Sequence, residues 1–594
     1  KRQVLNRQPE ARREFLIKSA VLDRMSGSLC EAVTGVAEGD TILRELEQAN
    51  LFIAPLDGGR RWYRYHQLFR ELLLVRLARQ QPSEAAHLHL RASRWYEQHG
   101  LLASAMRHAT AAEDIERQVA LIANNVLHLA YLGELRRLVR WLEFLPKELG
   151  ARQPWFHISQ AWVLAFAGHL EDVETELAAV DRSLEQLGEL ECTGGDFAAT
   201  ARHVRGHAAA IRGYLAGFRS ETDESLRLVH QALELLPGED RIARGWTTLL
   251  LAVELRALNK FQAADDAFVS AIALGRAAGS VPLTTDALWE PSWLQLIQGK
   301  LQNVLENSAA ALELADAHER ESGQRLAPTG YAHIGIAAVL HERNELALAL
   351  DHATVAVRLA RRWGMADARA RSELQLALTL QASGRVEEAG AMAMQAAETA
   401  AGISSAYAQI IDTSLARVHL AQGNLAAVEA WASENDLHED ADLSTLHLYR
   451  GIVFARLLMA QAEADARKRR SVRRVLLQFQ ERARAVAANG NLLEILALTA
   501  LNEAALGHDA AAQDALSEAL ALGETQGYMR TFVAEGEPMH NLLIAALAQN
   551  TAPPYTARLI AALEEDLSDP AQAMPGATLP ERLTERELAV LRLL

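Results

Sequence analysis

The residues best placed to bind a ligand are aromatic. Trp289 and Trp293 lie four positions apart beside Glu290, and Tyr331 follows later in the same region. Residues four apart share one face of a helix, and aromatic faces are platforms for sugars and apolar effectors. The alternative is that each ring packs in the core, which is the ordinary use of tryptophan in helical proteins. We predict that Trp289, Trp293 and Tyr331 bind a ligand.

The chain shows no arrangement of residues typical of catalysis. His87 and His89 are two apart in a predicted helix and face away from each other, and no H-E-x-x-H motif occurs. Cys30 and Cys192 are too far apart in sequence to suggest a thiolate metal site. Gly299 and Lys300 lack the rest of a phosphate-binding G-x-x-x-x-G-K-[ST] loop. We therefore predict no catalytic residues, no metal, no cofactor bound by these residues alone and no enzyme activity.

Helices must position the aromatic residues. Proline is scarce, with 15 residues, and apolar residues recur with the period of helices. From about residue 150 these helices come in pairs, whose turns are marked by glycine or asparagine at intervals of about 40 residues. These residue types end a helix in the left-handed conformation at little steric cost. The markers are Gly168, Gly217, Asn259, Gly299, Asn344, Gly384, Gly423 and Gly507.

Each helical pair leaves an apolar face that only the next pair can cover. Such pairs stack into a superhelix with a concave inner surface. The sequence therefore predicts an all-α fold, a tetratricopeptide-like superhelical repeat array over residues 151–536, with the ligand on its concave face.

The first 85 residues follow a different pattern. They predict helices over 13–22 and 41–50, a hairpin over 51–65 turning at Asp57-Gly58-Gly59, and a helix over 67–80. This is the order of a winged-helix domain. We expect the winged-helix domain at 1–85, linking helices at 86–150, a helix and linker at 537–580 and a capped helix at 581–594.

The net charge of −16 argues against this chain wrapping nucleic acid. One local exception is the basic run over residues 467–474, which falls in a degenerate or inserted repeat. A solvated helix face or loop explains that run better than a phosphate-binding surface does. No apolar run reaches the length of a membrane span, so we expect a cytoplasmic protein without membrane contact.

Five segments resemble a known family. Residues 15–30, Phe-Leu-Ile-Lys-Ser-Ala-Val-Leu-Asp-Arg-Met-Ser-Gly-Ser-Leu-Cys, and the Tyr65-His66-Gln67-Leu68-Phe69 segment resemble the winged helix of MalT-like, ATP-dependent LuxR-family transcriptional activators, which are signal-transduction ATPases with numerous domains. Residues 90–100 and 527–539 are similar to other parts of these proteins. Residues 583–594, Leu-Thr-Glu-Arg-Glu-Leu-Ala-Val-Leu-Arg-Leu-Leu, resemble the opening of their helix-turn-helix.

The resemblance implies a function and several site residues. His66 would lie near the nucleotide phosphates in the resting state, although Gln67 replaces the usual proline; a histidine bonded to the backbone is an equal alternative. Thr584, Arg586 and Glu587 would begin the DNA-binding domain. ATP or ADP would be the cofactor of the full-length protein, bound by a domain upstream of this chain.

The resemblance implies the inducer-sensing part of a transcriptional activator. Its partners would be a small-molecule inducer, promoter DNA and RNA polymerase, with self-association on activation. The alternative is a tetratricopeptide-type protein-interaction scaffold that holds a partner peptide in its groove, because repeat arrays permit both functions. The helix-turn-helix and winged-helix segments favour the first reading, since a scaffold needs neither.

Overall fold

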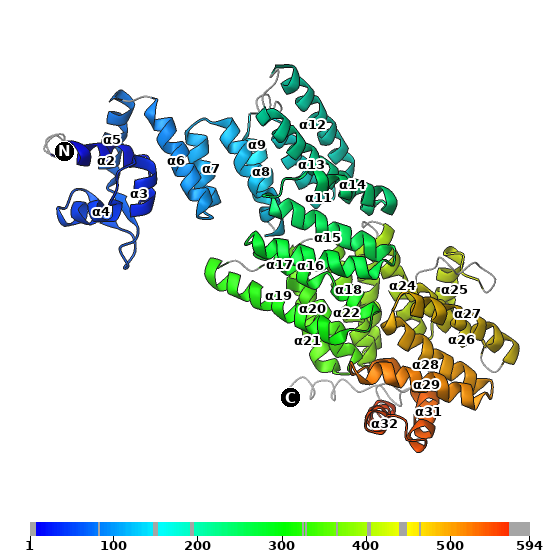
Figure 1. The fold of residues 1–594 in the computed structure, drawn as a ribbon. Helices are drawn as coiled ribbons and strands as arrows, with labels where there is room; N and C mark the ends of the chain where they lie inside the picture. The colour runs from blue at the N-terminus through cyan, green and yellow to red at the C-terminus, as the bar shows by residue number, and fades with distance from the viewer. Residues whose placement is uncertain are drawn as a thin grey trace, which may run out of the picture. The chain divides into compact units, whose positions relative to one another are not determined.

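The computed structural model describes residues 8–80, 83–132, 134–146, 153–190, 195–323, 326, 329–363, 366–400, 405–438, 448–462 and 465–568. The predicted all-α class is confirmed, and helices account for nearly all of the regular structure (Figure 1). The chain forms two compact units, one of residues 1–130 and 134–211 and one of residues 131–133 and 212–594. No described helix combines the length and apolar character that crossing a membrane requires.

The first unit begins with the predicted winged-helix order and one helix more. Its elements are α2 (Glu10–Ser19), α3 (Gly27–Thr34), α4 (Gly39–Gln48), β1 (Ile53–Pro55), β2 (Tyr63–Tyr65) and α5 (Gln67–Gln80). Helix α3 was not predicted, because it is short and has no apolar stripe longer than two turns. The Ser26 hydroxyl accepts a hydrogen bond from the Leu29 N–H and so caps it.

The hairpin turn differs in detail from the prediction. β1 pairs antiparallel with β2, with Ile53 opposite Tyr65. The two glycines do not supply the positive dihedral angle; Arg60 does, with φ 49°. The Asp57 carboxylate organises this wider turn instead, accepting hydrogen bonds from the backbone N–H groups of Arg61 and Trp62 at 2.9 and 3.1 Å.

The rest of the first unit is helical. The helices are α6 (Glu84–Gln98), α7 (Leu102–Ala111), α8 (Ile115–Tyr131), α9 (Leu135–Phe144), α11 (Pro154–Ala167), α12 (Leu170–Leu190) and the first part of α13 (Gly195–Phe218). Helix α6 packs against α7, and α11 packs against α9 and α12.

The second unit consists of helical pairs and a C-terminal group. Its helices are α14 (Thr222–Leu235), α15 (Arg241–Ala257), α16 (Phe261–Ala277), α17 (Val281–Trp289), α18 (Ser292–Ile297), α19 (Leu301–Ser322), α20 (Thr329–Glu342), α21 (Leu346–Trp363), α22 (Ala366–Ala382), α23 (Val386–Ala400), α24 (Ser405–Ala421), α25 (Leu425–Glu434), α26 (Leu448–Ala462), α27 (Ala466–Ala485), α28 (Asn489–Ala505), α29 (Asp509–Glu524), α30 (Arg530–Val533), α31 (Gly536–Ala548) and α32 (Pro553–Ser568).

Seven of the eight predicted turn markers have positive φ, among them Asn259 at 57° and Gly384 at 74°. The exception is Gly217, which lies inside α13; Ser220 takes the turn conformation instead, with φ 62°. Gly217 has a packing role, because a Cβ there would lie 2.1 Å from a carboxylate oxygen of Glu254. The basic run lies in α27, which packs against both α26 and α28.

The first helices of the pairs form an inner ring. Each contacts the first helix of the next pair, in the order α17, α20, α22, α24, α26 and α28. Helix α28 then returns to contact α18, and α30 contacts α20. The array therefore closes on itself, which the repeat pattern did not predict.

The closing contact between α18 and α28 depends on two glycines. A Cβ at Gly490 would lie 2.2 Å from the Leu296 carbonyl oxygen, and one at Gly299 would lie 3.0 Å from the Gly490 nitrogen. Backbone atoms of the two segments thus touch where a side chain would hold them apart.

Candidate functional site

Trp289 and Tyr331 are brought together by α17 and α20. Their rings are stacked, with centroids 3.8 Å apart and planes 5° from parallel, and the two residues are 6% and 5% exposed. The Arg371 guanidinium lies 5.1 and 5.2 Å from the two ring centres. Asp286 and Asp367 accept hydrogen bonds from the Trp289 indole and the Tyr331 hydroxyl, both at 2.6 Å. Because the rings cover each other, this geometry favours packing over ligand contact.

Trp293 is placed apart from this stack. The predicted single helix ends at Trp289, Pro291 precedes a new helix, and Trp293 projects from α18. Its ring is partly exposed and meets the edge of Tyr449 from α26, with centroids 6.5 Å apart. The Tyr449 hydroxyl lies 3.0 Å from that of Ser414 in α24. Trp293 therefore faces other helices of the inner ring.

Charged side chains gather on the same inner helices. We call Glu342, Arg417, Arg456, Glu494 and Glu535 the inner charge cluster. A carboxylate oxygen of Glu494 lies 3.0 Å from a guanidinium nitrogen of Arg417 and 2.7 Å from one of Arg456. Arg456 also forms an ion pair with the Glu535 carboxylate at 2.7 Å. The Arg417 side chain keeps 29% of its surface exposed and that of Arg456 keeps 20%. Both guanidiniums are thus paired, and both side chains are only partly exposed.

Burial governs the electrostatics of this cluster. It raises the pKa of Glu342. Burial also opposes the charge on Glu494, but the facing guanidiniums of Arg417 and Arg456 outweigh it and hold the pKa of Glu494 below its ordinary value. At the end of α20, burial followed by Arg530 and Arg417 lowers the pKa of His341 to about 3. Glu494 is therefore an anion that keeps two cations in place.

Hydrogen bonds connect the cluster to the C-terminal helices. The Glu342 carbonyl oxygen accepts the Met529 N–H at 2.7 Å, and its carboxylate accepts the Thr531 hydroxyl at 2.8 Å. Arg530 donates both to Asn344 at 3.3 Å and to Asp566 of α32 at 2.9 Å. Direct contacts thus link the inner ring to α32.

His66 lies between β2 and α5 with an exposed side chain. Its N–H donates to the Phe52 carbonyl oxygen at 2.7 Å, and its own carbonyl oxygen accepts the N–H groups of Phe69 and Arg70. These bonds fix its backbone and leave the imidazole at the surface. The predicted DNA-binding residues Thr584, Arg586 and Glu587 lie outside the described residues.

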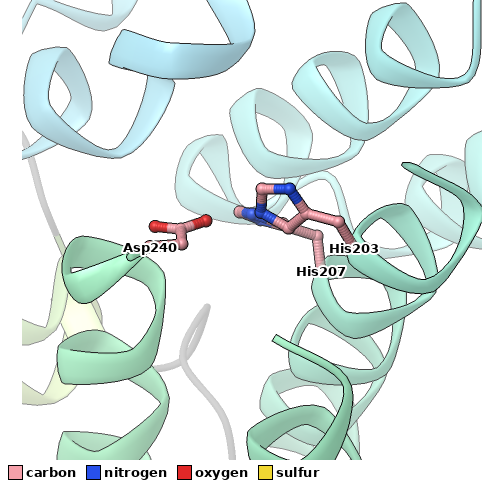
Figure 2. A group of neighbouring side chains, drawn as sticks. All are labelled: His203, His207 and Asp240. Carbon is pink, nitrogen blue, oxygen red and sulfur yellow. The ribbon is translucent and has the colours of Figure 1, made fainter. Parts of the chain in front are cut away.

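Two histidines lie one turn apart on α13, outside any H-E-x-x-H motif. His203 and His207 project from one face of this helix (Figure 2). Both rings meet the edge of Trp155, and the Trp162 indole donates to His207 Nδ1 at 3.1 Å. Asp240, also labelled in Figure 2, caps α15 by accepting the Ala243 N–H at 3.0 Å. Each of these polar groups has a structural partner.

Sequence reasoning missed the inner charge cluster. Its members come from separate pairs, so no spacing links them. A signal does exist at two positions: Arg456 interrupts the run Ile-Val-Phe-Ala-Arg-Leu-Leu over 452–458, and Glu494 interrupts Leu-Leu-Glu-Ile-Leu over 492–496. A charge inside a buried apolar run needs a partner, and here each is the partner of the other.

Two protein-family models match parts of this chain. Residues 206–549 match the MalT-like TPR region and residues 1–85 match the MalT winged helix domain. The HTH-type transcriptional regulator MalT of Cronobacter sakazakii is 27% identical over 570 residues, which is 93% of this chain and 59% of that protein. The chain thus spans about three fifths of the length of this relative.

Other matches are shorter or more distant. The serine/threonine-protein kinase PknK of Mycobacterium tuberculosis is 28% identical over 41% of this chain and 22% of its own length. A signal-transduction ATPase with a tetratricopeptide sensor from Pyrococcus horikoshii covers 93% of this chain and 66% of its own, with 12% identity and a TM-score of 0.30. The match to the repeat region spans more than half of the sequence, so the chain belongs to the family of MalT-like transcriptional regulators with a tetratricopeptide sensor region.

Proposed function

We propose that this chain is the inducer-sensing part of an ATP-dependent transcriptional activator. A small molecule binds the inner ring of the array, and its binding controls self-assembly and DNA binding by the full-length protein. The family membership supports the general role. The observation that carries the proposal is that partly exposed aromatic and charged groups, including Trp293, Tyr449, Arg417 and Arg456, converge on the inner ring.

The same geometry supports a compact ligand over an extended peptide. Trp293 meets Tyr449 across the ring and α18 contacts α28, so these contacts interrupt the concave surface on which a scaffold would hold a partner. Aromatic edges beside paired guanidiniums offer apolar contact and hydrogen-bond donors together.

Nucleotide and DNA binding belong to the proposal for the full-length protein. ATP or ADP is held by a domain outside this chain, and the exposed imidazole of His66 is available to approach its phosphates. The contact of Arg530 with Asp566 provides a route from the inner ring to the C-terminal end. An inducer that binds one arrangement of this ring better than another shifts the population toward it.

Paired variants of two tryptophans test the proposal. A metabolite panel is first screened against the purified chain by thermal shift, and the affinity of each hit is measured by calorimetry. We expect Trp293→Ala to weaken a hit at least tenfold while the melting temperature changes little, because this ring is partly exposed. Trp289→Ala is the control, and we expect it to cost roughly 3–5 kcal/mol of stability as a buried aromatic residue does.

Two results would contradict the proposal. One is a hit that binds the Trp293→Ala variant with the parent affinity. The other is a large loss of melting temperature in that variant, which would make Trp293 a packing residue.

A further inference from the structure

The outer face of α27 carries a concentrated positive charge. This helix of 20 residues has eight lysines and arginines and one acidic residue, Glu481, in a chain whose net charge is −16. Arg467, Arg470 and Arg474 are exposed and follow each other at the spacing of one helix face. The opposite side of α27 packs in the core through Val472, Val475, Leu476 and Phe479.

This arrangement is electrostatically unfavourable for the helix itself. Four cationic residues, 467–470, occupy the first helical turns, where the helix dipole is already positive, and like charges three and four apart repel. Asp465 offsets part of this cost by accepting the N–H groups of Arg467 and Lys468 at 2.8 and 3.3 Å. On one flank, Arg473 pairs with the buried Glu503 at 3.0 Å. Arg467, Arg470 and Arg474, which we call the arginine line, lie beside that flank with exposed side chains.

We propose that this arginine line binds the phosphate backbone of double-stranded DNA without reading its sequence. Seven residues of helix rise about 10 Å, and one DNA strand carries a phosphate about every 3.4 Å of its axis, so three arginines oppose about three phosphates. Guanidinium groups match phosphate oxygens in pairs, which makes arginine well suited to such contacts. The surface is distinct from the inner ring and would hold promoter DNA against the array.

Fluorescence anisotropy of a labelled 30-base-pair duplex of arbitrary sequence tests this inference on the whole chain. We expect binding at 50 mM KCl, with a slope of log affinity against log salt of about −2.7, which corresponds to a roughly 40-fold loss by 200 mM. The triple variant Arg467→Glu, Arg470→Glu, Arg474→Glu should bind more than tenfold more weakly. Its melting temperature should stay the same or rise, because glutamate suits the first turns of a helix.

A control variant separates the local surface from total charge. Arg227→Glu, Arg320→Glu and Arg385→Glu change the net charge equally at exposed positions elsewhere, and we expect the parent affinity apart from a small uniform loss. The inference is overturned if the duplex does not bind at 50 mM KCl or if both triple variants bind equally. It is also overturned if polyglutamate displaces the duplex at equal charge concentration, because the surface would then suit an acidic polypeptide. The inducer measurements on Trp293 variants are independent of all these results.

Discussion

Glu342 is a carboxyl group whose surroundings disfavour its charge. Burial raises its pKa above the ordinary value near 4.3, so the folded protein holds the proton more tightly than the unfolded chain. The stability from this group is complete below the unfolded pKa and is lost as the pH rises through the folded one. We expect Glu342→Gln to melt higher than the parent at pH 8, with the difference shrinking toward pH 4.5. A lower melting temperature at pH 8 would mean that the ionised carboxylate is needed.

A histidine pair in the first unit has the opposite pH dependence. Nδ1 of His89 and Nδ1 of His108 lie 2.8 Å apart, an arrangement that one proton can bridge and two cannot. Burial, then the facing His89, lowers the pKa of His108 to about 4. Because an unfolded histidine takes up its proton near 6.5, the stability is present above that pH and is lost as the pH falls toward 4.

Hydrogen exchange of peptides from α6 and α7, corrected for the intrinsic rate, measures this effect. We expect protection to fall between pH 7.5 and 5.5, and to fall less in the His108→Gln variant. His87→Gln, at an exposed position of α6, serves as the control and should behave like the parent. Equal pH dependence of protection in all three proteins would show that the pair of His89 and His108 does not cause it.

At the scale of elements, the contact between α18 and α28 should depend on the absence of a Cβ at Gly490. Gly490→Ala places a Cβ against the Leu296 carbonyl oxygen, and overpacking of this kind costs roughly 1–3 kcal/mol. We expect a lower melting temperature and faster hydrogen exchange over 296–302. Gly238→Ala is the control, because a Cβ there meets nothing within 4 Å. Unchanged exchange over 296–302 in the Gly490 variant would show that the contact is not close in solution.

The helices and most turns could be predicted because their causes are local. Glycine and asparagine ended helices where a positive φ was needed, as at Gly384 and Asn259. The prediction failed at Gly217, because only the tertiary structure shows that Glu254 packs against this glycine and that Ser220 makes the turn.

The candidate site could be predicted only in part. Trp293 was identified from its residue type, but its separation from Trp289 depends on the break at Pro291. Arg417, Arg456 and Glu494 come from three different pairs, and their meeting depends on the curvature accumulated over the repeats. Curvature follows from small rotations at every interface, and sequence periodicity does not encode it.

At the scale of the whole molecule, closure should hold the second unit together after a cut. In an open repeat array nicked at the Gly384 turn, only the packing of α22 against α23 and α24 would hold the two parts together, since each pair contacts only its neighbours. Here α18 also contacts α28 and α20 contacts α30, across the cut. We expect a chain with a protease site inserted at Gly384 to remain one species on size-exclusion chromatography after cleavage. Because α22 still packs against α23 and α24 across the cut, the same cut in the Gly490→Ala background should let the fragments separate at a lower urea concentration than the cut alone does. Release of two fragments from the cut parent chain without urea would contradict the closed ring.

The contact between Gly299 and Gly490 can form only after both segments have been synthesised. At roughly 5–20 residues per second, a ribosome needs about 10–40 s to add the nearly 200 residues that separate the two glycines. Neighbouring pairs can fold on one another during that interval, but α18 has no partner from α28 until it ends. Trp293 and the inner ring are therefore open to water, and to any small molecule already present in the cell, while the protein is being made. A small molecule present during translation would meet an array that has not yet closed.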